Sequence, residues 1–206
     1  MTENREPPGE SDREGAKQPE RFNPAKAASL DDRGRFSYLP PNDVLALLDA
    51  PKDVIVVDFG TGTGAYAFEM AWAQPDLIVY ALDEQDRMID LLRDKLAQRP
   101  TPNLKPMRTR EAHALNLRGR VDRILAINVL HELGDAALKD LALLPAPSGR
   151  ALFIDWNADV DRPVGPPQEH VYGPNEAKSR VERFGFTVAS RRLFQYHYAL
   201  ICDLDI

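Results

Sequence analysis

The chain has 206 residues and a formal net charge of −6; 43% of its residues are hydrophobic and 28% are charged, which suffices for one domain with a sizeable core. The acidic balance disfavours nonspecific binding of nucleic acid or anionic membranes, and the single cysteine, Cys202, excludes an intrachain disulfide and a thiolate-ligated metal cluster. No apolar run is long enough to cross a bilayer, and residues 1–15 lack the pattern of a secretory signal, so we expect a cytoplasmic protein without membrane insertion.

Residues 1–24 differ in composition from the rest of the chain. They contain Pro, Glu, Arg, Lys and Ser but hardly any large apolar side chain. Such a segment cannot bury enough surface to offset the entropy that is lost on ordering. We therefore predict a disordered tail over residues 1–24, followed by a single domain over residues 25–206.

Helical and extended patterns alternate after this tail. The first helix is expected at 40–51, capped by Asn42 or Asp43 and stopped by Pro51. Residues 187–204 are typical of two strands joined by a tight turn, and such strands are antiparallel. The other expected elements are helices at 64–74, 84–99, 137–144 and 173–186, and strands at 53–59, 76–83, 103–110, 121–130 and 150–156.

This alternation predicts an α/β fold with a Rossmann-like, doubly wound, mostly parallel sheet. The closing pair of strands adds an antiparallel hairpin at one edge. Ligands bind such sheets outside the carboxyl ends of the strands. The active side is therefore expected directly after five residues: Asp58, Asp83, Arg110, Asn128 and Trp156.

A glycine-rich turn, "FGTGTG", follows the first predicted strand. Gly60, Gly62 and Gly64 let the chain turn sharply and bring its backbone against a ligand. The spacing loosely matches a dinucleotide fingerprint, and a carboxylate at Asp83 suits both hydroxyls of a ribose. The glycines alone therefore admit both NAD and S-adenosylmethionine (SAM).

Charge separates these two cofactors. The pyrophosphate of NAD is an anion, and Asp58 would lie beside it, with Glu69 about a turn and a half into the next helix. SAM has no phosphate and carries a sulfonium and an ammonium, which are both cations. A carboxylate at this point favours SAM by roughly a few kcal/mol at intermediate dielectric. We therefore predict SAM as the cofactor and S-adenosylhomocysteine (SAH) as its product.

Five segments carry a more specific pattern than the glycines. In chain order they are "VVDFGTGTG", "VYALDEQDRMIDLLRDKL", "TREAHALNL", "VDRILAINVLHEL" and "GPPQEHVYGPNEAKSRVERFGF". Together they resemble the motifs of class I SAM-dependent methyltransferases (EC 2.1.1), in the UbiE-like small-molecule branch. The resemblance covers nearly everything from Phe22 to Cys202, and it implies seven strands in the order 3-2-1-4-5-7-6 with the seventh antiparallel.

The resemblance also implies which residues bind the cofactor. Asp83 would bind the ribose, Met88 would lie near the adenine, and Glu111 stands where the family more often has Asp. Residues 27–41 would close over the cofactor, so that Arg33, Arg35 and Tyr38 reach an anionic or aromatic acceptor; the alternative is a solvated linker. The implied cofactor-binding set is Asp58, Gly60, Thr61, Gly62, Gly64, Asp83, Glu84, Met88, Glu111, Ala112 and Asn128.

His131 and His170 are the candidates for catalysis. Methyl transfer is an in-line displacement, and it needs a general base only if the acceptor is a hydroxyl or a protonated amine. His131 is either such a base or part of the pocket wall, and Glu132 either orients His131 or, as we favour, caps the next helix. His170 either contacts the substrate or bonds to backbone. These residues follow no ligand spacing, so no metal is expected.

The prediction from sequence is thus a SAM-dependent methyltransferase that acts on a small-molecule acceptor. No nucleic-acid partner is expected, and a homodimer stays open. Trp156 either lines the acceptor pocket or packs at the sheet edge. The alternatives are a SAM-binding protein without turnover and an NAD-dependent oxidoreductase, against which Asp58 and the lack of a Tyr-x-x-x-Lys pair count.

Overall fold

The computed structural model describes residues 14–18 and 21–204. Its strands form one sheet in the order β3-β2-β1-β4-β5-β7-β6. The pairs among β1 to β5 are parallel, while β7 runs antiparallel to both β5 and β6. The predicted fold class and the strand order are therefore confirmed. The strands are β1 (Ile55–Phe59), β2 (Ile78–Asp83), β3 (Leu104–Arg108), β4 (Val121–Ile127), β5 (Pro145–Trp156), β6 (Phe186–Leu193) and β7 (His197–Leu204).

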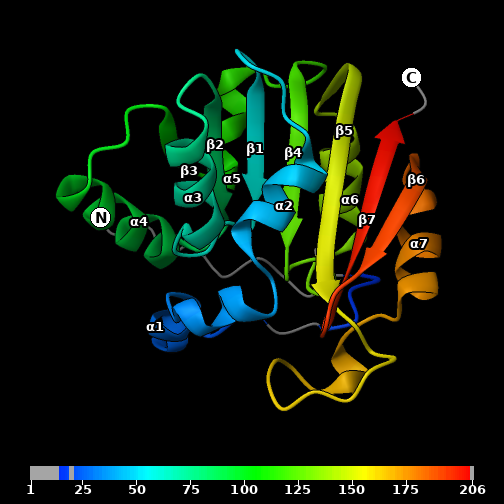
Figure 1. The fold of residues 1–206 in the computed structure, drawn as a ribbon. Helices are drawn as coiled ribbons and strands as arrows, with labels where there is room; N and C mark the ends of the chain where they lie inside the picture. Colours follow the sequence, from blue (N-terminus) through cyan, green and yellow to red (C-terminus); the bar gives the residue numbers. More distant parts are fainter. Residues whose placement is uncertain (1–13, 19–20, 205–206) are drawn as a thin grey trace, which may run out of the picture.

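Helices cover both faces of this sheet (Figure 1). One face carries α2 (Pro41–Leu48), α3 (Ala65–Ala73) and α4 (Asp86–Gln98), and the other carries α5 (Thr109–Ala112), α6 (Asp135–Ala142) and α7 (Pro174–Glu182). Neighbouring residues of a strand point to opposite faces. Accordingly Val56 and Val57 of β1 are both fully buried but belong to different hydrophobic clusters. This explains why the central strands are continuous apolar runs.

The first helix begins in a different way from the one predicted. Its N-cap is Pro40, no side chain caps it, and Pro41 occupies the first turn. Asn42 and Asp43 are therefore already inside the helix, because a proline at the first helical position needs no hydrogen-bond partner for a backbone N–H. Asp49 ends the helix in a left-handed conformation with φ of 46°.

The N-terminal segment crosses the arrowhead end of the parallel strands, where α1 (Ala27–Leu30) lies (Figure 1). The backbone N–H of Gln18 donates to the carbonyl of His131, and that of Asp135 donates to the carbonyl of Glu14, both at 2.8 Å. Within the predicted tail, residues 14–18 thus contact the domain through backbone hydrogen bonds. Residues 1–13 and 19–20 of this tail lie outside the described residues.

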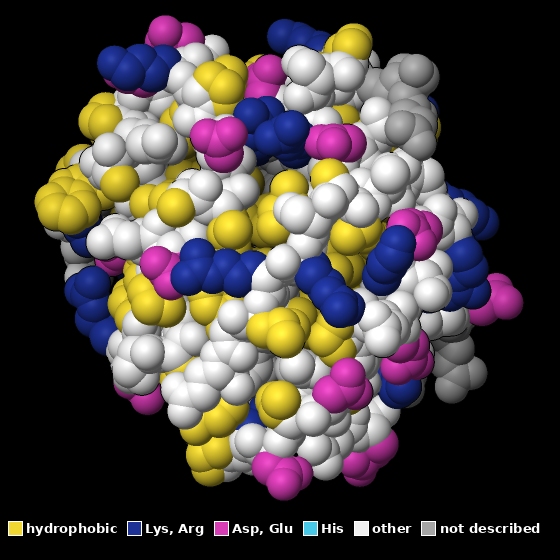
Figure 2. Space-filling model, turned by 45° about the vertical axis from the view of Figure 1, so that its right-hand side comes forward, with side chains coloured by type: hydrophobic (Ala, Val, Ile, Leu, Met, Phe, Trp, Pro, Cys, Tyr) yellow, Lys and Arg dark blue, Asp and Glu magenta, His cyan; other side chains and the backbone are white. Residues whose placement is uncertain are grey.

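The surface carries charges of both signs. On the face seen in Figure 2, Lys and Arg side chains are interspersed with Asp and Glu, and hydrophobic side chains lie between them. Within residues 14–18 and 21–204, none of the helices combines the length and the apolar character that a membrane span requires. The same residues contain no group of three or more His, Cys, Asp or Glu side chains placed to hold a metal ion.

Candidate functional site

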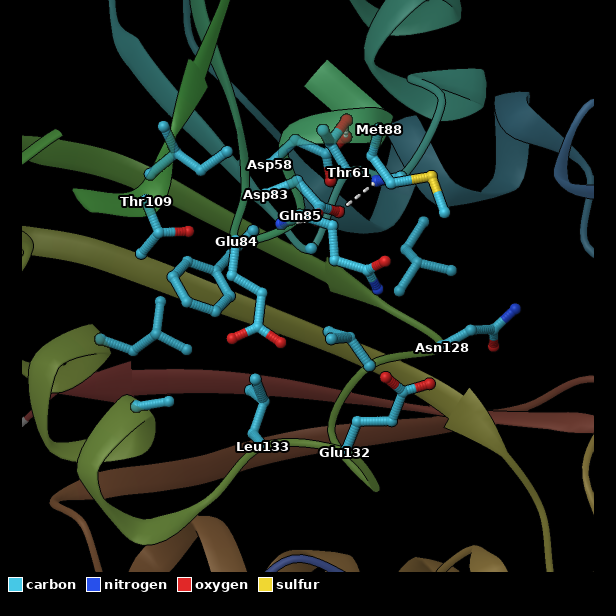
Figure 3. A pocket seen from close by; sticks show the side chains of 18 of the residues that line it. Asp58, Thr61, Asp83, Glu84, Gln85, Met88, Thr109, Asn128, Glu132 and Leu133 are labelled. Carbon is cyan, nitrogen blue, oxygen red and sulfur yellow. Dashed lines mark hydrogen bonds between the residues drawn. The ribbon is translucent and has the colours of Figure 1, made fainter. Parts of the chain in front are cut away.

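A cavity of about 540 Å³ opens at the carboxyl ends of β1, β2 and β4 (Figure 3). This is the side of the sheet on which the sequence predicts the ligand. Two of the predicted cofactor residues, Gly64 and Glu111, are absent from its lining. The predicted residues that the structure brings together there are Asp58, Gly60, Thr61, Gly62, Asp83, Glu84, Met88, Ala112 and Asn128.

The glycine turn is pressed against the turn that follows β4. Gly60 has φ of +72°, and a Cβ atom at this position would lie 2.7 Å from Cγ2 of Val129. The backbone N–H groups of Gly60 and Thr61 both donate to the carbonyl of Leu82, at 2.8 and 2.9 Å. Residue 60 therefore has to be glycine for two reasons, its backbone conformation and the space beside it.

Asp58 is a buried acid in the wall of the cavity. Only 4% of its surface is exposed, and it accepts a hydrogen bond of 2.7 Å from the hydroxyl of Thr61. Burial raises the pKa of Asp58 to about 7, against the lowering effect of the Thr61 hydrogen bond. The nearby charge of Asp83 raises it further. A cationic ligand beside this carboxyl would favour its charged form.

Asp83 joins the end of β2 to the glycine turn. Its two carboxylate oxygens accept hydrogen bonds of 2.9 Å from the backbone N–H groups of Gly62 and Gln85. Burial raises the pKa of Asp83 to about 6 even though both hydrogen bonds lower it. Each oxygen keeps a further lone pair, which suits the two hydroxyls of a ribose.

Arg21 and Phe22, which we call the strap, cross the cavity. The N–H of Phe22 donates to Oε2 of Glu132 at 3.2 Å, and the Phe22 carbonyl accepts from Nε2 of Gln85 at 3.0 Å. Arg21 pairs with Glu84 at 2.7 Å. The strap therefore links the end of β2 to the turn after β4, and both of its residues line the cavity.

A second contact holds the N-terminal segment against the glycine turn. The hydroxyl of Thr63 donates to Asp31 at 2.6 Å, and Lys95 contacts both the Asp31 carboxylate and the carbonyl of Thr63. Arg35, from the same segment, lines the cavity, whereas Arg33 pairs with Glu69 at its outside. The expected closure by residues 27–41 therefore brings one of the two arginines to the site.

The turn after β4 has a strained backbone and lines the cavity. Asn128 has φ of 55°, a region that L-residues other than glycine seldom adopt. Its Oδ1 atom is buried and has no hydrogen-bond partner in the described part of the chain. Backbone strain and an unsatisfied acceptor are both typical of functional sites.

Glu132 has a different position from the one favoured by the sequence. The N-cap of α6 is Gly134, and no side chain caps this helix. The Glu132 side chain instead lines the cavity, pointing into it from the side opposite the β2 residues (Figure 3). The reason is that the turn after β4 continues for two residues beyond Glu132, so that the helix begins out of its reach.

The two predicted catalytic histidines do not line the cavity. His131 is 2% exposed, and its Nδ1 atom lies 2.8 Å from Oδ1 of Asp155. Burial opposes the charged imidazolium, but the charge and hydrogen bond of Asp155 outweigh it, so that the pKa of His131 is raised. His170 lies in the short turn Gln168–His170, away from the cavity.

Trp156 does not line the cavity either. Its ring packs against His197 with centroids 4.1 Å apart, and against Tyr38 at 5.9 Å. Of the two alternatives that the sequence leaves open for Trp156, the structure therefore supports packing at the end of β5.

Several residues of the site were missed by the sequence analysis. Phe22 is one of them, although it is a large apolar residue directly before Asn23, whose side chain caps the next turn through the N–H of Ala25 at 3.0 Å. Thr109 lines the cavity where Glu111 was expected. Glu111 instead pairs with Arg108 at 2.9 Å. The other missed lining residues include Arg21, Gln85 and Asn116.

The lining fits the cofactor expected from the sequence. Asp58 provides a buried carboxyl that a cation would stabilise, and Gly60 keeps the turn free of side chains. Asn128 provides an unsatisfied hydrogen-bond acceptor.

Comparison with known proteins also concerns the kind of protein to which this cavity belongs. Residues 57–151 match a family model described as a methyltransferase domain. No curated protein matches the chain. A solved SAM-dependent methyltransferase from Aquifex aeolicus is 26% identical, with a TM-score of 0.83, and the match covers 90% of this chain and 100% of that one.

Two further solved structures share the fold. A putative type 11 methyltransferase from Sulfolobus solfataricus is 20% identical, with a TM-score of 0.64 and coverage of 82% of this chain and 94% of that one. Coclaurine N-methyltransferase, bound to N-methylheliamine and SAH, is 15% identical with a TM-score of 0.51, over 57% of this chain and 35% of that one. The fold, the cavity and these likenesses together support a class I SAM-dependent methyltransferase with SAM as its cofactor.

Proposed function

We propose that this protein transfers the methyl group of SAM to a small-molecule acceptor in the cytoplasm, as a member of the UbiE-like branch. The observation that carries this proposal is the position of two buried acids, Asp58 and Asp83, on either side of the glycine turn in one cavity. When bound, SAM supplies a methyl group that its sulfonium has activated. The residues of the chain then have to hold, orient and desolvate the reactants.

The cofactor residues divide by their chemistry. Asp58 and the bare backbone at Gly60 would hold the cationic methionine end, and Asp83 would bind the ribose. Met88 and Ala112 offer apolar contacts for the adenine, and both line the cavity. Glu111 is a weaker candidate for the adenine amino group, because two arginines already pair with it: Arg108 at 2.9 Å and Arg93 at 3.6 Å.

The acceptor would occupy the part of the cavity beneath the N-terminal segment. Phe22, Arg35, Tyr66 and Glu132 line the space. The backbone contacts of the strap close it over the turn after β4. Closure excludes water from the reacting groups, which strengthens the electrostatic interactions among them. An enclosed space of this kind suits a small molecule better than a nucleic acid.

Ligand binding and turnover test the proposal separately. SAM and SAH should raise the melting temperature of the protein, whereas NAD should not, because ligands that bind only the folded state stabilise it. Transfer of a labelled methyl group from SAM into a mixture of metabolites would then show turnover. Stabilisation by NAD alone would refute the cofactor assignment, and binding of SAM without any labelled product would favour a SAM-binding protein without turnover.

A further inference from the structure

Glu132 is the cavity-lining carboxylate on the turn after β4. Its Oε2 atom accepts from the N–H of Phe22 at 3.2 Å, and its side chain is oriented toward the cavity (Figure 3). The other acids of the lining have different neighbours: Asp58 is bonded to Thr61, and Glu84 is paired with Arg21. Glu132 is therefore the lining carboxylate that accepts a backbone hydrogen bond from the strap.

His131 lies immediately behind Glu132. Its Nε2 atom is 3.7 Å from Oε1 of Glu132, while its Nδ1 atom is 2.8 Å from Asp155 on the other side. Asp155 is fully buried and also accepts from the backbone N–H groups of His131 and Trp156, at 2.9 and 2.7 Å. Asp155 thus fixes the imidazole, and the imidazole in turn faces Glu132.

This arrangement is a chain of acid, imidazole and acid that runs from the sheet to the cavity. Arg162, in the loop after β5, also acts on His131, and its positive charge opposes protonation of the imidazole. When the imidazole is protonated, it lies between two carboxylates, and an opposite charge nearby favours the charged form of a carboxyl group. An ionised carboxylate can both attract a cation and accept a proton.

We propose that Glu132 is the general base of the transfer, that His131 and Asp155 are positioning residues behind it, and that the acceptor is an amine that is protonated when it binds. This inference rests on the proposed function and assigns the substrate class to the same site. An amine fits better than a hydroxyl because a carboxylate binds an ammonium group directly. The acidic side chains of the lining also outnumber the basic ones.

The reaction balances as follows. Glu132 takes one proton from the ammonium group of the acceptor, which leaves a lone pair on its nitrogen. This lone pair forms a bond to the methyl carbon while the bond between carbon and sulfur breaks, and the electron pair of that bond stays on the sulfur. The proton on Glu132 passes to solvent when the products leave.

Sinefungin tests the position of Glu132 without knowledge of the acceptor. In this analogue of SAM an amine-bearing carbon replaces the sulfonium and its methyl group, so its ammonium lies where the methyl group is transferred, whereas SAH has no group there. The dissociation constants of sinefungin and SAH should be measured by calorimetry for the wild type and for Glu132→Gln. We expect sinefungin to bind roughly tenfold to a hundredfold more weakly to Glu132→Gln, with SAH changed by about twofold at most.

Further variants make the result specific. Glu169→Gln removes an exposed carboxylate on the loop after β5, and it should leave the ratio of the two constants unchanged. His131→Asn keeps an N–H donor toward Asp155 but removes the charge behind Glu132. In this variant the ratio of the sinefungin constant to the SAH constant should rise as the pH is lowered from about 7.5 to 5.5, because no imidazolium then favours the charged form of Glu132, whereas the protonation of Asp58 affects both ligands alike.

The outcomes separate this inference from the proposed function. If Glu132→Gln leaves the ratio of the constants at the wild-type value, Glu132 does not lie beside the transferred methyl group and the inference is overturned. If both Glu132→Gln and Glu132→Asp lose affinity for SAH, Glu132 belongs to the cofactor site, which also overturns it. If the wild type binds neither SAM nor SAH, the proposed function itself fails.

Discussion

The ionisation of Asp58 should make SAM binding depend on pH. Burial raises the pKa of Asp58 to about 7 in the free protein, so the carboxyl group is largely protonated at pH 6 and largely ionised at pH 8. The cations of SAM bind the ionised form, and a proton therefore has to leave before SAM binds at low pH. The affinity for SAM should rise with pH across this window, and Asp58→Asn should remove most of the rise.

The size of the effect follows from this pKa. At one pH unit below the pKa about one protein molecule in ten carries the ionised group, so the dissociation constant of SAM should fall by about tenfold between pH 6 and 8.

The stability of the ligand-free protein changes in the opposite direction and should fall as the pH rises. The pKa of Asp58 is higher in the folded than in the unfolded state, so its contribution is complete below pH 3.8 and is lost as the pH rises to about 7. Between pH 5 and 7 this loss is on the order of 2 kcal/mol.

Two measurements test this reasoning. Calorimetry in buffers of different ionisation enthalpy would count the protons that are released when SAM binds at pH 6 and at pH 8. Urea unfolding of the wild type and of Asp58→Asn, at pH 5 and 7, would give the difference in stability that belongs to Asp58. A dissociation constant that stays constant from pH 6 to 8, or an equal pH dependence in Asp58→Asn, would refute the link between this carboxyl and the cofactor.

Three further predictions concern single side chains. Gly60→Ala should lower the free energy of unfolding by roughly 1–3 kcal/mol and weaken SAM binding, because the new methyl group meets Val129 and φ is positive. Urea unfolding would measure the first effect and calorimetry the second. Unaltered values would contradict the close approach of the two turns. Asp83→Ala should weaken SAM binding by roughly a hundredfold while the protein stays folded, and an unchanged affinity in calorimetry would exclude its role at the ribose. His197 is buried, and burial lowers its pKa to about 3, so its contribution to stability is present above pH 6.5 and is lost as the pH falls toward 3. Between pH 7 and pH 4 the free energy of unfolding of the wild type should therefore fall by on the order of 3 kcal/mol more than that of His197→Phe. An equal fall in both proteins would disprove this.

The fold could be predicted because its signals are local. Continuous apolar runs such as the one around Val56 and Val57 arise from burial on both faces of a strand, and this burial also implies a parallel sheet with helices on each side. The predicted start of α2, by contrast, was wrong, because either Pro41 or the polar residues after it could begin a helix. Local patterns thus predict the elements better than their ends.

The site residues that could be predicted are those whose position is determined by the end of a strand. Asp58 and Asp83 line the cavity because each occupies the carboxyl end of a parallel strand. The charge state of Asp58 was not predictable, since it depends on how deeply the surrounding elements bury it. The sequence indicated His131 as a catalytic candidate and favoured a helix cap for Glu132, whereas Glu132 lines the cavity and His131 does not. Two neighbouring residues in a turn point in different directions, which only the tertiary contacts determine.

The backbone of the strap bears on how a ligand enters the cavity. The amide of Phe22 is bonded to one rim of the cavity and its carbonyl to the opposite rim, so both bonds have to break together when a ligand passes on this side. Because one residue carries both bonds, a ligand that enters between Gln85 and Glu132 has to displace the strap as a whole, and the same displacement lets it leave.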